Sequence, residues 1–379
     1  MPELEVPYVD LVGQYAPLRQ ELLDAVGRVL DHGQFILGPE VEEFEARFAD
    51  LGGTRFAVGV ASGTDAIVLA LRALEVGPGD EVITAPNSFV ATASAIAVVG
   101  ARPVFVDVGD DMNLDPDGIA AAVTPQTRAV LPVHLTGRPA AMDRIVDVCR
   151  RHGLAIVEDC AQAVLAELGG RRVGSFGDIG CFSLHPLKTL GAAGDAGVLT
   201  TNDESLAQRL RLLRNIGLVS RDDAVLWSTN SRLDTLQAAM MLVKLPHVDA
   251  WTEARRANAA AYHEGLDDVP GVIVPGEGPE ERAVYHTYVM QTEQRDRLRD
   301  HLKGLGIGTA IHYPVPIHLQ SVGRALGYGE GDFPVAERQA QRILSLPVYQ
   351  GLTQEQREHV IAGVRSFASA RGEATAVAR

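Results

Sequence analysis

Lysine is scarce in this chain of 379 residues, which holds only Lys188, Lys244 and Lys303 among its 34 lysines and arginines. Lys244 and Lys303 stand in helical patterns beside charged residues, so we expect both to be solvated. Lys188 follows the apolar run DIGCFSL and a short turn. A lysine amine in low-dielectric surroundings loses its proton and attacks carbonyl carbon, which guanidinium does not do. The pattern favours Schiff-base chemistry at Lys188, with a lysine that merely reaches water from a strand end as the alternative.

Cysteine and long apolar runs are also scarce. The three cysteines, Cys149, Cys160 and Cys181, form no C-x-x-C pair, which argues against a disulfide framework or a zinc knuckle. No run reaches the roughly 18 apolar residues of a membrane span, and no basic leader precedes an apolar stretch at the start. We therefore expect a cytoplasmic protein without a membrane partner.

Positive charge is outnumbered, because 34 basic residues face 49 acidic ones and give a net charge of −15. Nucleic-acid binding needs a lysine and arginine surface that replaces counterions, so we expect no nucleic-acid partner. Hydrophobic residues make up 46% of the chain and charged residues 22%, as in an ordinary globular protein. At roughly 150 residues per domain, the length predicts two domains.

Short apolar runs alternate with helical patterns between residues 54 and 201. This rhythm predicts a mostly parallel sheet, and the nearly continuous apolar character predicts helices on both of its faces. The ligand of such a doubly wound α/β domain lies beyond the carboxyl ends of the strands, where Asp159 and His134 close two runs. The runs are FAVGV, EVITA, PVFVDV, AVLPVH, LAIVED, DIGCFSL and AGVLTT.

Two domains are expected along the chain. We assign residues 1–250 to a large α/β domain, with about the first 15 residues as an arm. A long helical pattern rich in alanine and leucine leads out of it, and the Pro- and Gly-rich stretch VPGEGPEERAVYH has the composition of a surface connection. Residues 251–379 are then a smaller α+β domain.

The stretch FAVGVASGTDAIVLALRAL predicts a strand, a glycine turn and a helix that starts near Ser62, Gly63 and Thr64. The free N–H groups and the dipole at a helix start form an anion site that suits a phosphate. The alternative is an ordinary helix cap made by Ser or Thr.

Asp159 ends a strand that we expect to be buried, and Gln162 follows it in VEDCAQA. A buried carboxylate needs a cationic or hydrogen-bonding partner. A protonated pyridine nitrogen is one such partner and would act as an electron sink during transamination. A salt bridge to an arginine is the alternative.

Taken together, the glycine-turn helix, D-x-x-Q and F-S-x-x-P-x-K resemble the DegT/StrS family of nucleotide-sugar aminotransferases. These are pyridoxal 5'-phosphate (PLP) enzymes of the aspartate-aminotransferase fold, fold type I, with a mostly parallel seven-stranded sheet in the large domain. The resemblance extends over nearly the whole chain. It rests on GPEVEEFEARFAD, VASGTDAIVLAL, GDEVITAPNSFVATASAI, LPVHLTGRPAAMD, VEDCAQA, CFSLHPLKTLGAAGDAG, NSRLDTLQAAM, IHYPVPIHL and LSLPVY.

The resemblance implies a role for each matching residue around the cofactor. Lys188 would carry PLP as a Schiff base and move protons, and Asp159 would pair with the pyridine nitrogen. The other implied contacts are Gln162 at the ring hydroxyl, Phe89 stacked on the ring, and Ser183 with Gly63 and Thr64 at the phosphate.

The resemblance also implies a homodimer with shared active sites, in which Asn230 of NSRLD reaches the cofactor phosphate of the neighbouring subunit. We place His185, His312 and Tyr313 at the substrate side of the pocket, with an ordinary turn histidine as the alternative for His185. A metal site at His312, Tyr313 and His318 is rejected, because the resemblance puts this segment at the substrate entrance and no carboxylate or cysteine completes a ligand set.

The implied function is amino transfer from L-glutamate to a nucleotide-linked keto-deoxysugar, with the keto group at C-3 or C-4. A PLP-dependent sugar dehydratase is the nearest alternative, but family members of that kind lack the lysine that is present here as Lys188. A non-catalytic regulatory protein of the same fold would not require the whole set of site residues. An NAD-dependent Rossmann enzyme is set aside, because VASGTDA lacks the G-x-G-x-x-G spacing.

Overall fold

A seven-stranded sheet lies at the centre of the computed structural model, which describes residues 4–377. Its strand order is β1-β9-β8-β5-β4-β2-β3, and only the pairs made by β9 are antiparallel. The predicted mostly parallel seven-stranded sheet is therefore confirmed. The strands are β1 (Phe56–Val60), β2 (Glu81–Thr84), β3 (Arg102–Phe105), β4 (Thr127–Leu131), β5 (Ala155–Asp159), β8 (Ile179–Ser183) and β9 (Gly197–Thr201).

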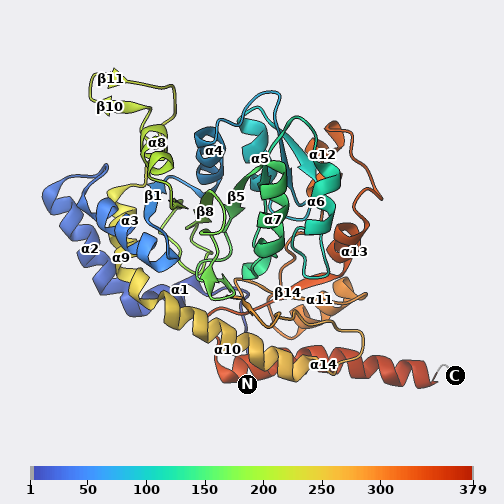
Figure 1. The fold of residues 1–379 in the computed structure, drawn as a ribbon. Coiled ribbons are helices and arrows are strands. Elements are labelled where there is room, and N and C mark those ends of the chain that lie inside the picture. The colour runs from blue at the N-terminus through green and yellow to red at the C-terminus, as the bar shows by residue number, and fades with distance from the viewer. Residues whose placement is uncertain (1–3, 378–379) are drawn as a thin grey trace.

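Both faces of this sheet are covered by helices, which explains why its strands are apolar throughout. Successive residues of a strand point to opposite faces, so Val82 and Ile83 of β2 enter two different hydrophobic clusters. One face packs against α4 (Gly63–Ala73), α5 (Ala91–Val98) and α8 (Glu204–Arg214), and the other against α3 (Pro39–Gly52), α6 (Pro116–Ala122) and α7 (Met142–His152) (Figure 1).

The N-terminal helices pack beside the sheet. The short helix α1 (Leu11–Tyr15) leads into α2 (Arg19–His32), and both α2 and α3 contact α9 (Thr235–Lys244). A hairpin of β10 (Leu218–Ser220) and β11 (Asp223–Ala224) projects from the body beyond α8 (Figure 1).

The long helix α10 (Val248–Leu266) runs from α9 into the C-terminal part of the chain (Figure 1). A separate hydrophobic cluster forms there around an antiparallel strand pair, and it also includes Val6 from the expected N-terminal arm. The remaining elements are β6 (Glu167–Leu168), β7 (Arg171–Arg172), β12 (Glu281–Arg282), β13 (Tyr288–Gln291), β14 (Ile343–Leu346), α11 (Arg295–Gly304), α12 (Ser321–Ala325), α13 (Pro334–Arg342) and α14 (Gln354–Val377).

Within residues 4–377, the structure contains no helix with the length and apolar character required to span a membrane.

Candidate active site

A cavity of about 410 Å³ opens at the carboxyl ends of the central strands. Its wall comes from the start of α4, the segment before α5, the ends of β5 and β8, and a segment near residue 312. The sequence-predicted site residues in this wall are Gly63, Thr64, Phe89, Asp159, Gln162, Ser183, His185, Lys188, His312 and Tyr313.

Lys188 lies in the loop that follows β8 and faces this cavity. A turn fixes its backbone, because the Lys188 N–H donates to the His185 carbonyl oxygen at 2.8 Å. Burial lowers the pKa of Lys188 to about 8, although the nearby Asp159 carboxylate acts in the opposite direction. A lysine with this pKa is partly neutral at physiological pH and is thereby a nucleophile.

Asp159 ends β5 and has only 4% of its surface exposed. Its side chain accepts hydrogen bonds from the Thr92 hydroxyl at 2.8 Å and the Ala161 N–H at 3.1 Å. Burial raises its pKa, while these two bonds and the charge of Lys188 oppose the shift. No cation within residues 4–377 forms an ion pair with it at 4.0 Å or less. A protonated pyridine nitrogen, which offers one positive N–H, therefore fits this carboxylate.

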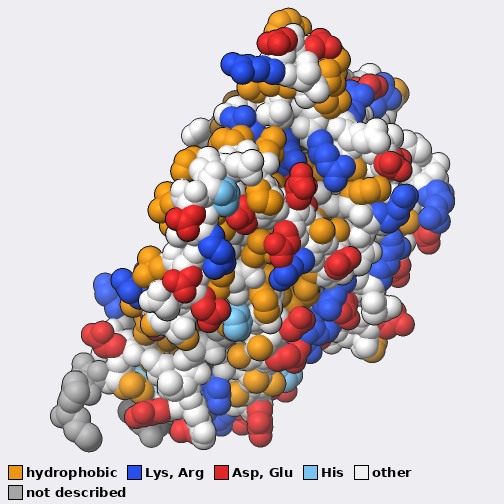
Figure 2. Space-filling view, turned by 90° about the vertical axis from the view of Figure 1, so that its left-hand side faces the viewer, with side chains coloured by type: hydrophobic (Ala, Val, Ile, Leu, Met, Phe, Trp, Pro, Cys, Tyr) orange, Lys and Arg blue, Asp and Glu red, His pale blue; other side chains and the backbone are white. Residues whose placement is uncertain are grey.

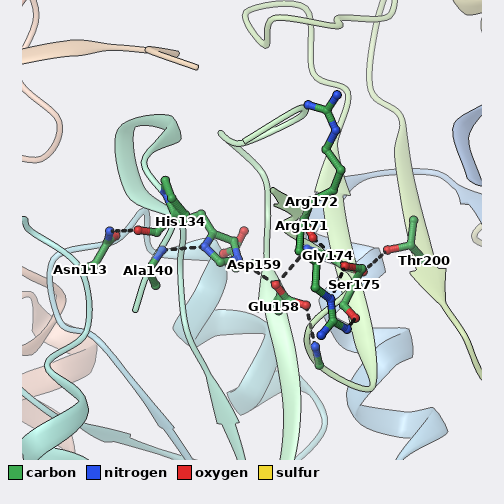
Figure 3. A network of polar contacts seen from close by, with 12 residues as sticks. Asn113, His134, Ala140, Glu158, Asp159, Arg171, Arg172, Gly174, Ser175 and Thr200 are labelled. Carbon is green, nitrogen blue, oxygen red and sulfur yellow. Dashed lines mark hydrogen bonds and ion pairs between the residues drawn. The ribbon is translucent and has the colours of Figure 1, made fainter. Parts of the chain in front are cut away.

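Glu158, the preceding residue, points to the opposite side of β5 and holds the scaffold together (Figure 3). Its carboxylate accepts from the N–H groups of Gly174 at 2.8 Å and Gly177 at 2.7 Å. Its other contact is Nε2 of His134 at 3.1 Å, whose Nδ1 accepts from the Ala140 N–H. Because Nδ1 is an acceptor, Nε2 carries the proton and donates to Glu158. These bonds fix the end of β5, where Asp159 stands.

The start of α4 supplies the features of a phosphate site. Ser62 caps the helix by accepting from the Asp65 N–H at 3.1 Å, which leaves the N–H groups of Gly63 and Thr64 for an anion. Gly63 packs directly on Ser183, since a Cβ at position 63 would lie 2.6 Å from the Ser183 Cβ. Only glycine brings the helix start so close to the Ser183 hydroxyl, so this corner fits the PLP phosphate.

Gln162 and Tyr313 form another part of the cavity wall and contact each other. The Gln162 side chain accepts from the Thr136 N–H at 2.6 Å and donates to the Tyr313 hydroxyl at 3.3 Å. Phe89 is 55% exposed, and its ring centroid lies 5.6 Å from that of Tyr313. An exposed aromatic side chain in a cavity wall is available for stacking on a planar cofactor.

His185 and His312 differ in their surroundings. His185 is exposed at the rim of the cavity. His312 contacts the Ser345 hydroxyl through Nδ1 at 2.9 Å, and burial together with the charge of Lys188 lowers its pKa to about 4. His312 is therefore neutral at physiological pH.

Asn230 is the one predicted site residue that the structure leaves outside the cavity wall. It is exposed, and its backbone forms a bridge to Asn215 beyond the end of α8. The sequence interpretation placed its contact in a neighbouring subunit, which stays a prediction.

Sequence reasoning missed Ser88, Thr92 and His286, which also line the cavity. Ser88 contacts the Thr92 hydroxyl at 2.8 Å and extends the hydrogen-bonded chain to Asp159. His286 precedes β13, so its position as a polar residue next to a strand was the sequence signal that could have indicated a site residue.

The expectation that Lys244 is solvated was wrong. It is fully buried, and its Nζ lies 3.7 Å from the centroid of the Tyr15 ring and donates to the Gly191 carbonyl oxygen.

A family model, described as the DegT/DnrJ/EryC1/StrS aminotransferase family, matches residues 17–365. The chain belongs to this family. A dTDP-3-amino-3,4,6-trideoxy-alpha-D-glucose transaminase of Streptomyces venezuelae is 46% identical over 364 residues, which cover 96% of each chain. A pleiotropic regulatory protein of Geobacillus stearothermophilus is 43% identical over 367 residues, which cover 96% of this chain and 99% of the relative.

Solved structures show the same fold. DesV of Streptomyces venezuelae, in complex with a ketimine intermediate, superposes with a TM-score of 0.94 at 46% identity, and the match covers 96% of this chain and 98% of DesV. NtdA of Bacillus subtilis with bound cofactor PMP superposes with a TM-score of 0.90 at 29% identity, over 96% of this chain and 85% of NtdA. The predicted fold type I is confirmed, and PLP is the cofactor of this DegT/DnrJ/EryC1/StrS aminotransferase.

Proposed function

We propose that this protein transfers an amino group from L-glutamate to a nucleotide-linked keto-deoxysugar, with PLP as cofactor. One observation carries the proposal: a lysine amine of lowered pKa and a buried carboxylate that forms no ion pair within the described residues share a cavity with the start of α4. The name of the Streptomyces relative supports a dTDP-linked sugar with the keto group at C-3.

Each residue of the cavity has a distinct task in this proposal. PLP, when bound, supplies an electron-accepting ring that stabilises negative charge on the substrate carbon. Asp159 keeps the ring nitrogen protonated, Gly63 and Thr64 bind the phosphate through their N–H groups, and Phe89 stacks on the ring. Lys188 holds the cofactor and moves a proton between carbon atoms as general base and acid.

Two other functions were open from the sequence. The presence of Lys188 favours amino transfer over dehydration, because the sugar dehydratases of this family lack that lysine. A purely regulatory role does not account for an amine and a carboxylate whose pKa values are both shifted by burial in one cavity.

A homodimer with shared active sites is also part of the proposal. Figure 2 shows the side of the molecule on which α2 lies, and hydrophobic side chains are spread over it. Val12 is 82% exposed, and Leu23 and Leu30 on α2 are also exposed. Apolar side chains that are exposed together favour an interface with a second copy of the chain. We place this homodimer in the cytoplasm.

Absorbance spectroscopy tests the proposed reaction. PLP-loaded protein is expected to lose the absorption band of its lysine-bound cofactor when L-glutamate is added. Adding dTDP-3-keto- or dTDP-4-keto-6-deoxyhexose is expected to restore the band and to yield an amino sugar by NMR. A band that L-glutamate leaves unchanged would overturn amino transfer from this donor.

A further inference from the structure

Arg255 is a buried arginine that forms no ion pair with a carboxylate within the described residues 4–377. It stands on α10 with 5% of its surface exposed. Its Nη1 donates to the carbonyl oxygens of Tyr285 and His286 at 3.4 and 3.2 Å, and its Nε has no hydrogen-bond partner within residues 4–377. Arg214, which is buried to a similar degree, forms an ion pair with Glu45. A buried cation is costly unless it is paired, so the unpaired Arg255 requires an explanation.

The guanidinium of Arg255 borders a small cavity of about 50 Å³. This volume holds a group of a few atoms, since one water needs roughly 10–15 Å³. Leu187, His286 and His312 line both this cavity and the larger one around Lys188, so the two cavities adjoin.

Unsatisfied polar atoms gather in the wall of the small cavity. Nδ1 of His286 and the Thr287 hydroxyl are buried and, like the Arg255 Nε, lack a hydrogen-bond partner within the described chain. Buried polar groups almost always have partners, so three without one beside a single cavity indicate a missing ligand.

The charge around the cavity is positive, although the whole chain carries a net charge of −15. Burial lowers the pKa of Arg255 to about 10, so it remains cationic at neutral pH. The pKa of His286 lies well below its ordinary value because of burial and the charges of Lys188 and Arg255. Burial raises the pKa of Tyr8, so this phenol stays neutral beside the guanidinium. Arg255 therefore keeps a charge that no carboxylate in the described lining of the small cavity compensates.

We propose that this cavity, the donor pocket (Tyr8, Arg255, His286, Thr287 and His312), binds a carboxylate of the amino donor. Arg255 supplies the charge and Thr287 a hydrogen bond, while the donor's amino group reaches the adjoining cavity at Lys188. The inference rests on the proposed function and specifies an amino acid as the first substrate. A nucleoside diphosphate is too large for this space, so the nucleotide of the sugar substrate lies outside the donor pocket.

Calorimetric titration of the PLP-loaded protein with glutarate, a dicarboxylate without an amine, tests the donor pocket apart from turnover. Arg255→Met is expected to weaken glutarate binding by about 10- to 100-fold, as for loss of a charged hydrogen bond. Arg255→Lys is expected to restore part of the affinity. The matched control is Arg256→Met, since Arg256 already pairs with Glu277 and its loss leaves glutarate binding unchanged.

The two half-reactions separate the donor pocket from the proposed function. In Arg255→Met, the KM for L-glutamate is expected to rise, while the amine-loaded enzyme still reacts with the keto sugar and binds dTDP. Unchanged glutarate affinity in the variant, or equal losses in both half-reactions from a purely structural role, would overturn the inference. A wild-type protein that binds glutarate but transfers no amine would overturn the proposed function alone.

Thr287→Val keeps the shape and charge of the donor pocket, so it tests carboxylate binding there even if Arg255→Met does not fold. The loss of one hydroxyl is expected to weaken glutarate binding by about 5-fold. An affinity equal to that of the wild type would exclude Thr287 from the pocket and overturn the proposal.

Discussion

Burial lowers the pKa of Lys188 and raises that of Asp159, so it favours the neutral form of both groups. The charge of each residue partly opposes the pKa shift of the other. The amine is thereby ready to attack a carbonyl carbon, and a cationic nitrogen facing the carboxylate would stabilise its charged form. The hydrogen bonds from Thr92 and Ala161 keep Asp159 oriented for that nitrogen.

The pH dependence of PLP capture follows from these shifts. Only the neutral amine condenses with an aldehyde, so the capture rate of cofactor-free protein is expected to rise with pH and level off above about 8. Asp159→Asn removes the negative charge that raises the Lys188 pKa, so the midpoint is expected to move to lower pH. Stopped-flow absorbance measures both profiles, and a midpoint that moves upward would contradict the assigned coupling.

Residues at strand ends were predictable, and residues brought in by distant packing were not. Asp159 ends β5 and Lys188 follows β8, and these two parallel strands are neighbours whose carboxyl ends lie at one edge of the sheet. Arg255 stands inside an ordinary helical pattern, and only the docking of α10 brings it near the cavity. Lys244 was placed in solvent because its helix gives no sign that Tyr15 covers it.

At the scale of single elements, the contact between α4 and β8 positions the phosphate site. Gly63→Ala would force a Cβ to within 2.6 Å of the Ser183 Cβ and displace the helix start. PLP affinity is expected to fall by about 10-fold or more through weakened phosphate contacts. Equilibrium binding of PLP measures the loss.

Gly304→Ala is the matched control for this substitution. Gly304 is the last residue of α11, away from the proposed dimer face, and a Cβ there meets no atom within 4 Å. Alanine in a helix is expected to leave PLP affinity unchanged and to stabilise the fold slightly. Equal PLP affinities in Gly63→Ala and Gly304→Ala would contradict the tight corner at Ser183.

The burial of Lys244 between α9, Tyr15 and Gly191 makes stability depend on pH. Burial lowers the pKa of Lys244 from 10.5 to about 7. Between these values the unfolded chain binds a proton that the folded protein lacks, so this group makes the free energy of unfolding rise with pH. Below about pH 7 the lysine is protonated in both states and the full burial cost applies.

Lys244→Met is expected to remove this rise. The difference in unfolding free energy, wild type minus variant, should become more favourable to the wild type between about pH 6 and about pH 9 in urea titrations. Lys303→Met is the control, because Lys303 is exposed and should show no such change. A constant difference for Lys244→Met would contradict the lowered pKa.

At the scale of the whole molecule, the sequence resemblance predicted the fold, while the division into residues 1–250 and 251–379 stays a proposal. Val6 shows why such a boundary is hard to read from sequence. It lies in the arm assigned to the large domain, yet it packs with C-terminal residues and bridges to Ile307. Contacts between distant segments leave no local pattern in the sequence.

Active sites that are shared between subunits predict that two different inactive variants complement each other in a mixed dimer. Lys188→Ala removes the amine, and Asn230→Asp places a negative charge at the proposed phosphate contact. In a mixed dimer, one site combines both changes and the other has neither, so activity is expected to return when the two inactive variants are refolded together. Turnover of the mixture measures this, and a mixture as inactive as its parts would show that each site is built from one chain.

Borohydride reduction of the PLP-loaded protein, followed by peptide mass spectrometry, tests the central claim most directly. The account predicts a pyridoxyl group on Lys188 and none on Lys244 or Lys303, and Lys188→Arg should carry no label. A polypeptide that remains unlabelled, or a label on another lysine, would contradict the site described around Asp159.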